Sequence, residues 1–135
     1  MRQLDERTWV SPRQLRPADV AALPALGVTL IVNNRPDGEE AGQPAGAEIE
    51  AAARAAGIAY RHIPVAGGFN LDDVLEMAEA LAESEGRALL FCRTGTRSTF
   101  LWALARSERG AARDELVARA AAAGYDLGPI AASLN

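Results

Sequence analysis

The chain has 135 residues, a net charge of −4 and 49% apolar residues. This length suits one compact domain with a substantial hydrophobic core, so we expect a single domain over residues 1–135. The acidic balance, with no basic run longer than two residues, argues against a nucleic-acid-binding protein. No apolar stretch is long enough to cross a bilayer, which argues against a membrane protein.

The first residues and the cysteine content bear on the cellular setting. Residues 1–6 are mostly charged or polar and lack the apolar segment of a secretory signal. Cys92 is the single cysteine, so an internal disulfide is excluded, in keeping with a reducing compartment. The sequence therefore predicts a cytoplasmic protein.

Runs typical of strands alternate with helical patterns along the chain. Short runs of β-branched and apolar residues predict strands at residues 8–10, 29–33, 58–65 and 89–92. Helical spacing, proline starts and glycine stops predict helices at residues 18–26, 47–56, 71–85, 98–109, 114–123 and 129–134. This order predicts an α/β fold: a single domain with a parallel-rich central sheet flanked by helices on both faces.

The segment from Cys92 to Ser98 carries the most specific chemistry. Cys92 ends an expected strand, and ligands of parallel sheets bind beyond such carboxyl ends. The loop that follows directs backbone N–H groups into one concavity that suits an anion. A cysteine at its rim and Arg97 within it favour a thiolate, and therefore covalent chemistry on an anionic substrate. The alternative is a buried, inert thiol, which the polar residues of the loop make less attractive.

This loop supplies most of the candidate site residues. Cys92 is the predicted nucleophile, and Arg97 is predicted to bind the oxygens of the substrate through its guanidinium group. The further candidates for anion binding are Arg93, Thr94, Gly95, Thr96 and Ser98. For Arg93 the alternative is a solvated loop charge, and for Gly95 it is a simple turn glycine.

A second polar loop, residues 33–40, follows a strand whose carboxyl end should open on the same side of the sheet. Arg35 and Asp37 are therefore secondary site candidates, with a salt-bridged loop as the alternative. His62 is the only histidine; its mid-strand place predicts a structural role over a Cys–His pair. No Cys/His cluster suggests a metal and no glycine-rich nucleotide loop is present, so we expect neither a metal nor a cofactor.

Four segments together, residues 10–15, 31–39, 60–65 and 92–98, resemble the phosphatase-like domain of the beta-lactamase hydrolase-like family. The resemblance extends over nearly the entire chain. It implies the fold of dual-specificity (cysteine) protein phosphatases, and some members are described as sulfurtransferases. It also implies that Ser98 hydrogen-bonds the thiolate, as the residue after the arginine does in phosphatases, with a helix N-cap as the alternative.

The chain departs from the phosphatase pattern in two ways. Four residues separate Cys92 from Arg97, where cysteine phosphatases have five, so the loop resembles the six-residue loop of rhodanese-type sulfurtransferases. Residues 66–68 are Ala-Gly-Gly where dual-specificity phosphatases keep an aspartate as general acid. Asp72 and Asp73 follow a few residues later, where the first turn of the next helix is expected.

These departures favour a cysteine-dependent sulfurtransferase that carries sulfane sulfur as a Cys92 persulfide. Sulfite leaves thiosulfate without protonation, whereas an alkoxide needs an acid that contributes about 10²–10⁴ in rate. The alternative is a cysteine-based phosphatase with a phosphocysteine intermediate. We expect a small anionic substrate (thiosulfate, a persulfide or a phosphate ester), a thiol acceptor and, as a candidate partner, a persulfide-metabolising enzyme. Thiol-dependent arsenate reduction usually needs resolving cysteines, which are absent; a non-catalytic anion-binding module is the remaining alternative.

Overall fold

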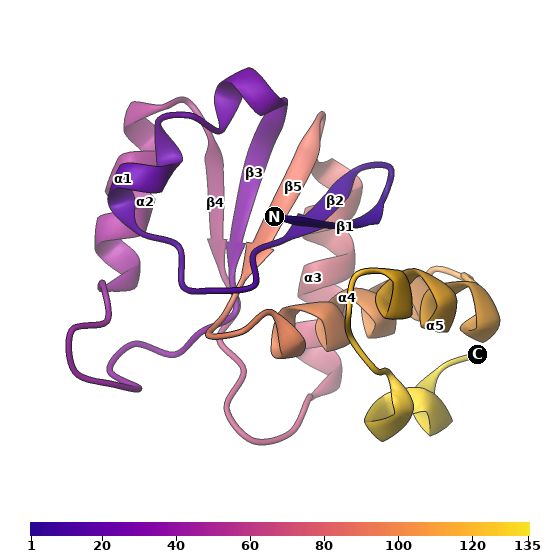
Figure 1. The fold of residues 1–135 in the computed structure, drawn as a ribbon. Coiled ribbons are helices and arrows are strands. Elements are labelled where there is room, and N and C mark those ends of the chain that lie inside the picture. The colour runs from indigo at the N-terminus through magenta and orange to yellow at the C-terminus, as the bar shows by residue number, and fades with distance from the viewer.

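The computed structural model describes residues 1–135, which form a five-stranded sheet with helices on both faces (Figure 1). The strands lie in the order β1-β2-β5-β3-β4. They are β1 (Arg2–Asp5), β2 (Thr8–Val10), β3 (Val28–Asn33), β4 (Ala59–His62) and β5 (Arg87–Phe91). All neighbours pair in parallel except β1, which is antiparallel to β2. The predicted α/β fold with a parallel-rich sheet is confirmed.

Helices cover each face of the sheet, and each face has its own apolar core (Figure 1). One side carries α1 (Pro17–Val20), a 3₁₀ turn (Pro24–Leu26) and α2 (Gly46–Ala55). The other carries α3 (Leu71–Glu83), α4 (Thr96–Glu108), α5 (Arg113–Ala122) and a closing 3₁₀ segment (Gly128–Ser133).

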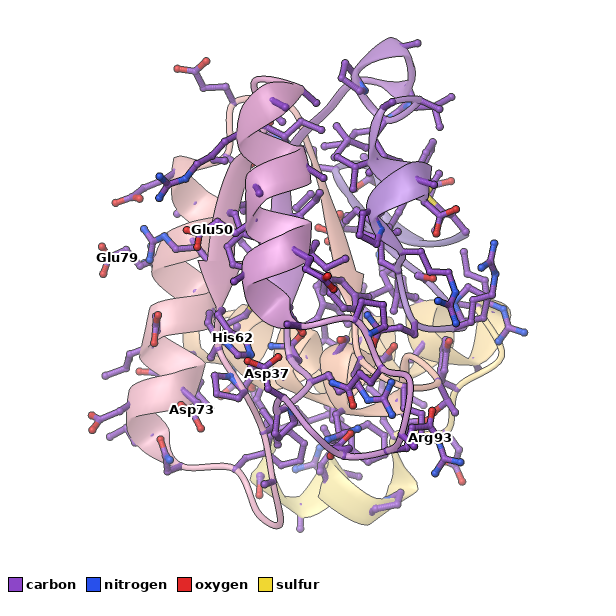
Figure 2. The ribbon with its side chains drawn as sticks, turned by 90° about the vertical axis from the view of Figure 1, so that its left-hand side faces the viewer. Asp37, Glu50, His62, Asp73, Glu79 and Arg93 are labelled. Atoms are coloured by element: carbon purple, nitrogen blue, oxygen red, sulfur yellow. The ribbon has the colours of Figure 1, made fainter.

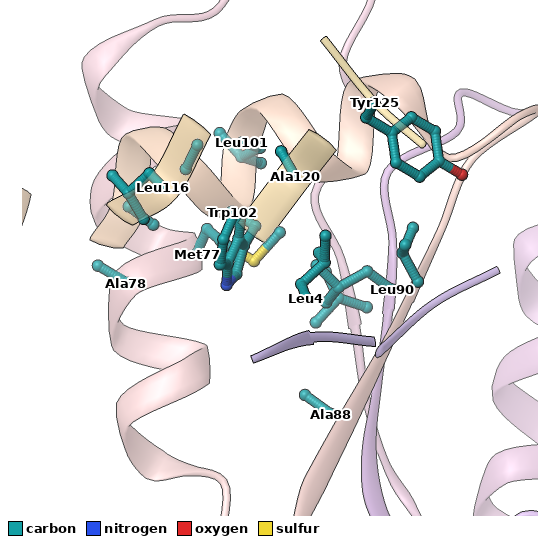
Figure 3. Close-up of a cluster of buried hydrophobic side chains, with 14 of the residues drawn as sticks. Leu4, Met77, Ala78, Ala88, Leu90, Leu101, Trp102, Leu116, Ala120 and Tyr125 are labelled. Atoms are coloured by element: carbon teal, nitrogen blue, oxygen red, sulfur yellow. The ribbon is translucent and has the colours of Figure 1, made fainter. Parts of the chain in front are cut away.

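The larger core lies between the sheet and α3, α4 and α5, and Figure 3 shows Trp102 at its centre. Trp102 is fully buried, and its indole N–H donates to Asp5 Oδ2 at 2.9 Å, which satisfies both buried polar groups. Met77 and Leu116 pack in the same cluster. This core fixes α4, the helix that follows the cysteine loop.

Three local differences from the predicted elements have physical causes. Strand β1 was missed because Arg2–Asp5 lacks a β-branched or apolar run and is held by pairing with β2. The predicted helix at 18–26 is two short pieces, because Pro24 cannot donate a hydrogen bond to the preceding turn. The predicted helix at 98–109 begins earlier, at Thr96, because Gly95 in a left-handed conformation ends the loop there.

The carboxyl ends of β3, β4 and β5 meet at one edge of the sheet, at the lower end in Figure 1. Asn33, the last residue of β3, stands in register with Phe91 of β5 and His62 of β4. The loops after these strands therefore converge beside Cys92. None of the helices is both long and apolar enough to cross a membrane.

Candidate active site

Cys92 is the first residue after β5, and only 1% of it is exposed. The backbone N–H of Gly95 donates to its Sγ at 3.1 Å. Gly95 has a φ of +91°, and a Cβ there would overlap the Tyr125 hydroxyl and lie 2.9 Å from the Ser11 carbonyl oxygen. Only glycine fits this tight turn, which wraps the loop around the sulfur.

The loop leads directly into the amino end of α4. The first hydrogen bond at that end joins the Thr99 N–H to the Gly95 carbonyl at 2.9 Å. The N–H groups of residues 96–98 therefore have no partner within the helix, and the helix dipole favours a negative charge beside them. Such a helix start, next to a cysteine, can hold an anionic group during attack by the sulfur.

Ser98 is not an N-cap, because Gly95 occupies the N-cap position of α4. Its side chain is fully buried and donates to Asn34 Oδ1 at 2.8 Å. The Asn34 amide in turn donates to the Ile63 carbonyl at 2.9 Å. Ser98 thus ties α4 to the loop after β3 and to the chain beyond β4, which fixes the positions of all three segments.

Arg97 makes a two-pronged ion pair with Glu39. Its Nη1 lies 2.7 Å from Glu39 Oε2 and its Nη2 lies 2.8 Å from Oε1, while Nη1 also donates to the Val65 carbonyl at 2.9 Å. Hydrogen bonding to Glu39 raises the pKa of Arg97 against the opposing effect of burial, and Cys92 also contributes to the rise. Cys92 and Arg97 stand at the two ends of the same six-residue loop, the arrangement that attack on a bound anion requires.

Arg35 is buried, with 1% of its side chain exposed, and all three guanidinium nitrogens are hydrogen-bonded. Nε donates to Glu39 Oε1 at 2.8 Å, Nη1 to Gln14 Oε1 at 2.9 Å and Nη2 to Glu40 Oε1 at 3.1 Å. The salt-bridged loop that the sequence left open as the alternative is the arrangement found here. Through the shared oxygen of Glu39, this loop also reaches Arg97.

Glu39 is the residue that sequence reasoning missed. Hydrogen bonding from Arg97, with a smaller contribution from Arg35, lowers its pKa from 4.5 to about 2 against the opposing effect of burial. The available signal was the position of Glu39 four residues after Arg35 in a loop expected beside the site. The contact with Arg97, 58 residues away, left no pattern in the sequence.

A cavity of about 290 Å³ opens among these charges. It is lined by Arg35, Glu39, Glu40, Arg93 and Arg97, with no hydrophobic residue. Arg93 is 65% exposed, lies 3.9 Å from a Glu40 oxygen and points outward in Figure 2. A larger cavity of about 420 Å³ contains no residue of the cysteine loop. The charged lining makes the smaller cavity the better candidate for a small, polar substrate.

The remaining loop candidates, Thr94 and Thr96, lie on the outer side of the turn. Their hydroxyl oxygens are 3.2 Å apart. The Thr94 carbonyl accepts a hydrogen bond from the Tyr125 hydroxyl at 2.9 Å. Tyr125 therefore supports the loop from behind, a role that nothing in its sequence neighbourhood indicated.

Asp37 and His62 lie outside the cavity lining. Asp37 Oδ1 accepts the Gly46 N–H at 2.7 Å, so it holds the amino end of α2, as its place in Figure 2 shows. His62 Nε2 is 2.9 Å from the Arg35 carbonyl oxygen. His62 ends β4 instead of lying in mid-strand, and its bond is to the backbone, as the structural interpretation expects. No three His, Cys, Asp or Glu residues are grouped closely enough to hold a metal ion.

Residues 1–109 match the family described as beta-lactamase hydrolase-like protein, phosphatase-like domain. A beta-lactamase hydrolase-like protein of Xylella fastidiosa is 43% identical over 104 residues, which cover 76% of this chain and 24% of that protein. One from Agrobacterium fabrum is 38% identical over 109 residues, covering 80% and 25%. The chain thus spans about a quarter of the length of these curated relatives.

Solved structures share the fold. A Neisseria meningitidis protein, provisionally assigned as a phosphatase, is 37% identical with a TM-score of 0.84, covering 99% of this chain and 95% of that one. The active form of Tk-PTP is 19% identical with a TM-score of 0.67, covering 94% and 86%. Pseudomonas aeruginosa TpbA in complex with pTyr is 18% identical with a TM-score of 0.61, covering 85% and 67%.

The family resemblance and the cysteine-phosphatase fold expected from the sequence are both confirmed. The last two structures establish the fold alone, because their sequences have diverged so far. The match over residues 1–109 and the identity to the two named relatives establish the family. The chain belongs to the beta-lactamase hydrolase-like family, in which it is a phosphatase-like domain.

Proposed function

We propose that residues 1–135 act as one domain that transfers sulfane sulfur through a persulfide on Cys92. The observation that carries this proposal is the short loop, in which α4 begins four residues after the cysteine. The N–H of Gly95, one of the loop amides, already donates a hydrogen bond to Cys92 Sγ. Fewer amides are left for the three oxygens of a phosphoryl group, whereas a single sulfur atom needs less room.

In the proposed step, the Cys92 thiolate attacks the outer sulfur of thiosulfate. A new S–S bond forms with the thiolate electron pair, the original S–S bond breaks, and sulfite leaves with that pair. Arg97 and the amides at the start of α4 hold the departing oxyanion. A thiol acceptor then takes the sulfur from Cys92 and regenerates the thiolate. The persulfide so formed on the acceptor is the substrate that a persulfide-metabolising partner would consume.

The carboxyl groups around Cys92 favour a leaving group that departs without being protonated. Residues 66–68 offer no carboxyl group. The carboxyl group bonded to Arg97 is that of Glu39. Its pKa is lowered to about 2, so it is ionised near neutral pH and cannot donate a proton. An enzyme that expels an alkoxide gains about 10²–10⁴ in rate from such a donor. Sulfite needs none.

The second candidate is a cysteine-based phosphatase that passes through a phosphocysteine. The comparisons favour this candidate over the sulfurtransferase, because the solved structures of the same fold include the phosphatases above and one of them holds pTyr. It predicts hydrolysis of phosphate esters, most readily those with good leaving groups.

One experiment separates the two. The protein is exposed briefly to thiosulfate, and its mass is then measured by mass spectrometry. In parallel, the rate of sulfur transfer to cyanide is compared with the rate of p-nitrophenyl phosphate hydrolysis. We expect one added sulfur on Cys92 and faster sulfur transfer. The variant Cys92→Ser should lose both, since no base activates a serine there. Robust hydrolysis of a phosphotyrosine peptide without any persulfide would establish the phosphatase instead.

Two loop variants refine that test. Arg97→Lys should weaken either activity, because the charge stays while the two-pronged geometry is lost. One residue inserted between Gly95 and Arg97 should harm sulfur transfer more than phosphate hydrolysis, since it widens the loop toward the phosphatase length. The opposite ranking would contradict the sulfurtransferase.

A further inference from the structure

Arg97 has one pair of neighbouring N–H groups left for a substrate. Of the five N–H groups of its guanidinium, two on Nη1 donate to Glu39 and to the Val65 carbonyl, and one on Nη2 donates to Glu39. The remaining two, one on Nε and one on Nη2, lie along the same side of the planar group. Such a pair has the spacing that binds two oxygens of one anion. Arg97 lines the cavity of about 290 Å³, so a ligand there can reach its guanidinium group.

We propose that Glu39 is a positioning residue: it holds Arg97 by the Nη1–Nη2 end and so presents the free Nε–Nη2 side to two oxygens of one substrate anion. The use of Arg97 to bind the substrate rests on the proposed function. The ligand class is an oxyanion with at least two oxygens on one atom, as in sulfate, thiosulfate or a phosphate ester. The effect of Glu39 on anion binding requires no turnover, so it can be measured separately.

Glu39 is itself fixed by bonds that do not involve Arg97. Its backbone N–H donates to Gln43 Oε1 at 3.0 Å, and the Gln43 amide donates to the Pro36 carbonyl at 2.9 Å. Its Oε1 also accepts a hydrogen bond from Arg35 Nε at 2.8 Å. The carboxylate therefore has a defined place on the loop after β3, and from that place it orients the guanidinium group of Arg97.

Arg35 connects this arrangement to the sheet. Its backbone N–H donates to Asn33 Oδ1 at 2.9 Å, and its carbonyl oxygen lies 2.9 Å from His62 Nε2, so the ends of β3 and β4 both hold it. The Arg35 side chain is 1% exposed, whereas that of Arg97 is 24% exposed. Ordering a long, partly exposed side chain when a ligand binds costs affinity. The Arg35–Glu39 pair lowers this cost by holding Arg97 in place before the anion arrives.

Charge and position lead to opposite expectations for the Glu39 carboxylate. If only its charge mattered, removing a negative group beside Arg97 would strengthen the binding of an anion. If Glu39 positions Arg97, removing the carboxylate frees the guanidinium group and weakens the binding. The sign of the change in affinity therefore identifies the role of Glu39.

The test measures sulfate binding by calorimetry for the wild type, Glu39→Gln and Glu40→Gln. For Glu39→Gln we expect the Kd for sulfate to rise about three- to tenfold, the cost of ordering one long side chain on binding. Glu40→Gln removes the same charge from the same cavity, but Glu40 pairs with Arg35 and Arg93. Its Kd should therefore change by less than about twofold.

Three results would overturn the positioning role. Sulfate binding that is unchanged or tighter in Glu39→Gln would show that the carboxylate does not orient Arg97 for an anion. Equal weakening in Glu39→Gln and Glu40→Gln would show a general loosening of the loop. A wild type that binds no sulfate would show that Arg97 presents no anion site.

A second pair of variants shows whether Glu39 acts through Arg97. In an Arg97→Lys background the paired N–H groups are absent, so adding Glu39→Gln should cause no further loss of sulfate affinity. A loss that persisted there would also overturn the inference, because Glu39 would then support only the fold. Failure of the proposed function is distinguishable from these results. The expected sulfate affinities, in a protein that transfers no sulfur from thiosulfate, would keep the positioning role and reject the sulfurtransferase.

Discussion

The two loops that meet beside Cys92 are held in place by different forces. The cysteine loop, residues 92–97, is fixed by backbone geometry and packing: a left-handed Gly95, a supporting hydroxyl from Tyr125 and the buried helix behind it. The loop after β3, residues 34–45, is fixed near the site by charged side chains around Arg35. The first loop therefore depends mainly on the backbone and on packing, whereas the second depends on ion pairs and hydrogen bonds between side chains. The candidate nucleophile belongs to the loop held by packing, and Glu39, the ion-pair partner of Arg97, belongs to the loop held by charge.

The largest expected effect tests the packing of the cysteine loop. In Gly95→Ala the new methyl group meets the Tyr125 hydroxyl and the Ser11 carbonyl in a backbone conformation that disfavours alanine. We expect a loss of about 4 kcal/mol in the free energy of unfolding, together with loss of activity. Gly38→Ala is the matched control, because its φ is also positive but nothing lies near a Cβ there. Urea unfolding of both variants measures the difference; equal losses would mean that φ alone matters.

The next effect tests the charged loop. Arg35→Ala removes a buried cation and leaves Glu39, Glu40 and Gln14 without their common partner. Breaking such a network should cost about 3 kcal/mol. Arg54→Ala, which breaks an exposed pair with Glu50, should cost less than about 0.5 kcal/mol. A loss for Arg35→Ala as small as that control would show that packing holds this loop too.

A smaller effect concerns pH. The pKa of Glu39 is lowered from 4.5 to about 2, so its ionised form stabilises the folded protein above pH 4.5, and this stabilisation is lost as pH falls toward 2. Wild type should exceed Glu39→Gln in unfolding free energy by about 1.5 kcal/mol at neutral pH, after allowing for solvent screening. Denaturation series from neutral to acidic pH should show this gap closing. A gap that persisted at the lowest pH would contradict the ionic origin.

The smallest expected effect tests the hydrogen bond by which Tyr125 supports the cysteine loop. Tyr125→Phe removes only the hydrogen bond to the Thr94 carbonyl and should cost about 1 kcal/mol. Hydrogen exchange of the loop amides should speed up in this variant. Tyr60→Phe, whose hydroxyl bonds Asn33 on β3, provides the control for loss of a tyrosine hydroxyl elsewhere. Faster exchange in the loop for both variants would show that Tyr125 has no local role.

The sequence predicted well what depends on local pattern. Strands were found at all four predicted places, because a buried parallel strand requires apolar runs bounded by turn residues, but the strand expected over residues 58–65 covers only Ala59–His62. The edge strand β1 was not predicted, because it is held by pairing with β2 and has no apolar run of its own. The break in the helix expected over residues 18–26 was not predicted, because the helical spacing of its apolar residues was given more weight than Pro24, which interrupts helices.

At the site, the sequence could single out candidate residues near one another in the chain, whereas it gave no sign of their distant partners. The loop from Cys92 to Arg97 is a continuous segment, so its geometry is encoded in its own residues. Glu39 bonds Arg97 across 58 residues, through a loop whose path is set by ion pairs and by no periodic pattern. Ser98 was assigned to the thiolate or to an N-cap, yet it bonds Asn34, 64 residues away.

Tyr125 also has a bearing on where this unit can be cut. The family match ends at residue 109, whereas the hydroxyl that supports the cysteine loop comes from residue 125, after α5. A protein truncated at Arg109 would keep the nucleophile and its arginine but expose the back of the turn and strip α5 from the larger core. We therefore expect a stably folded unit to extend beyond the segment by which the family is recognised, so that engineered fusions or excised domains should retain the chain through Tyr125.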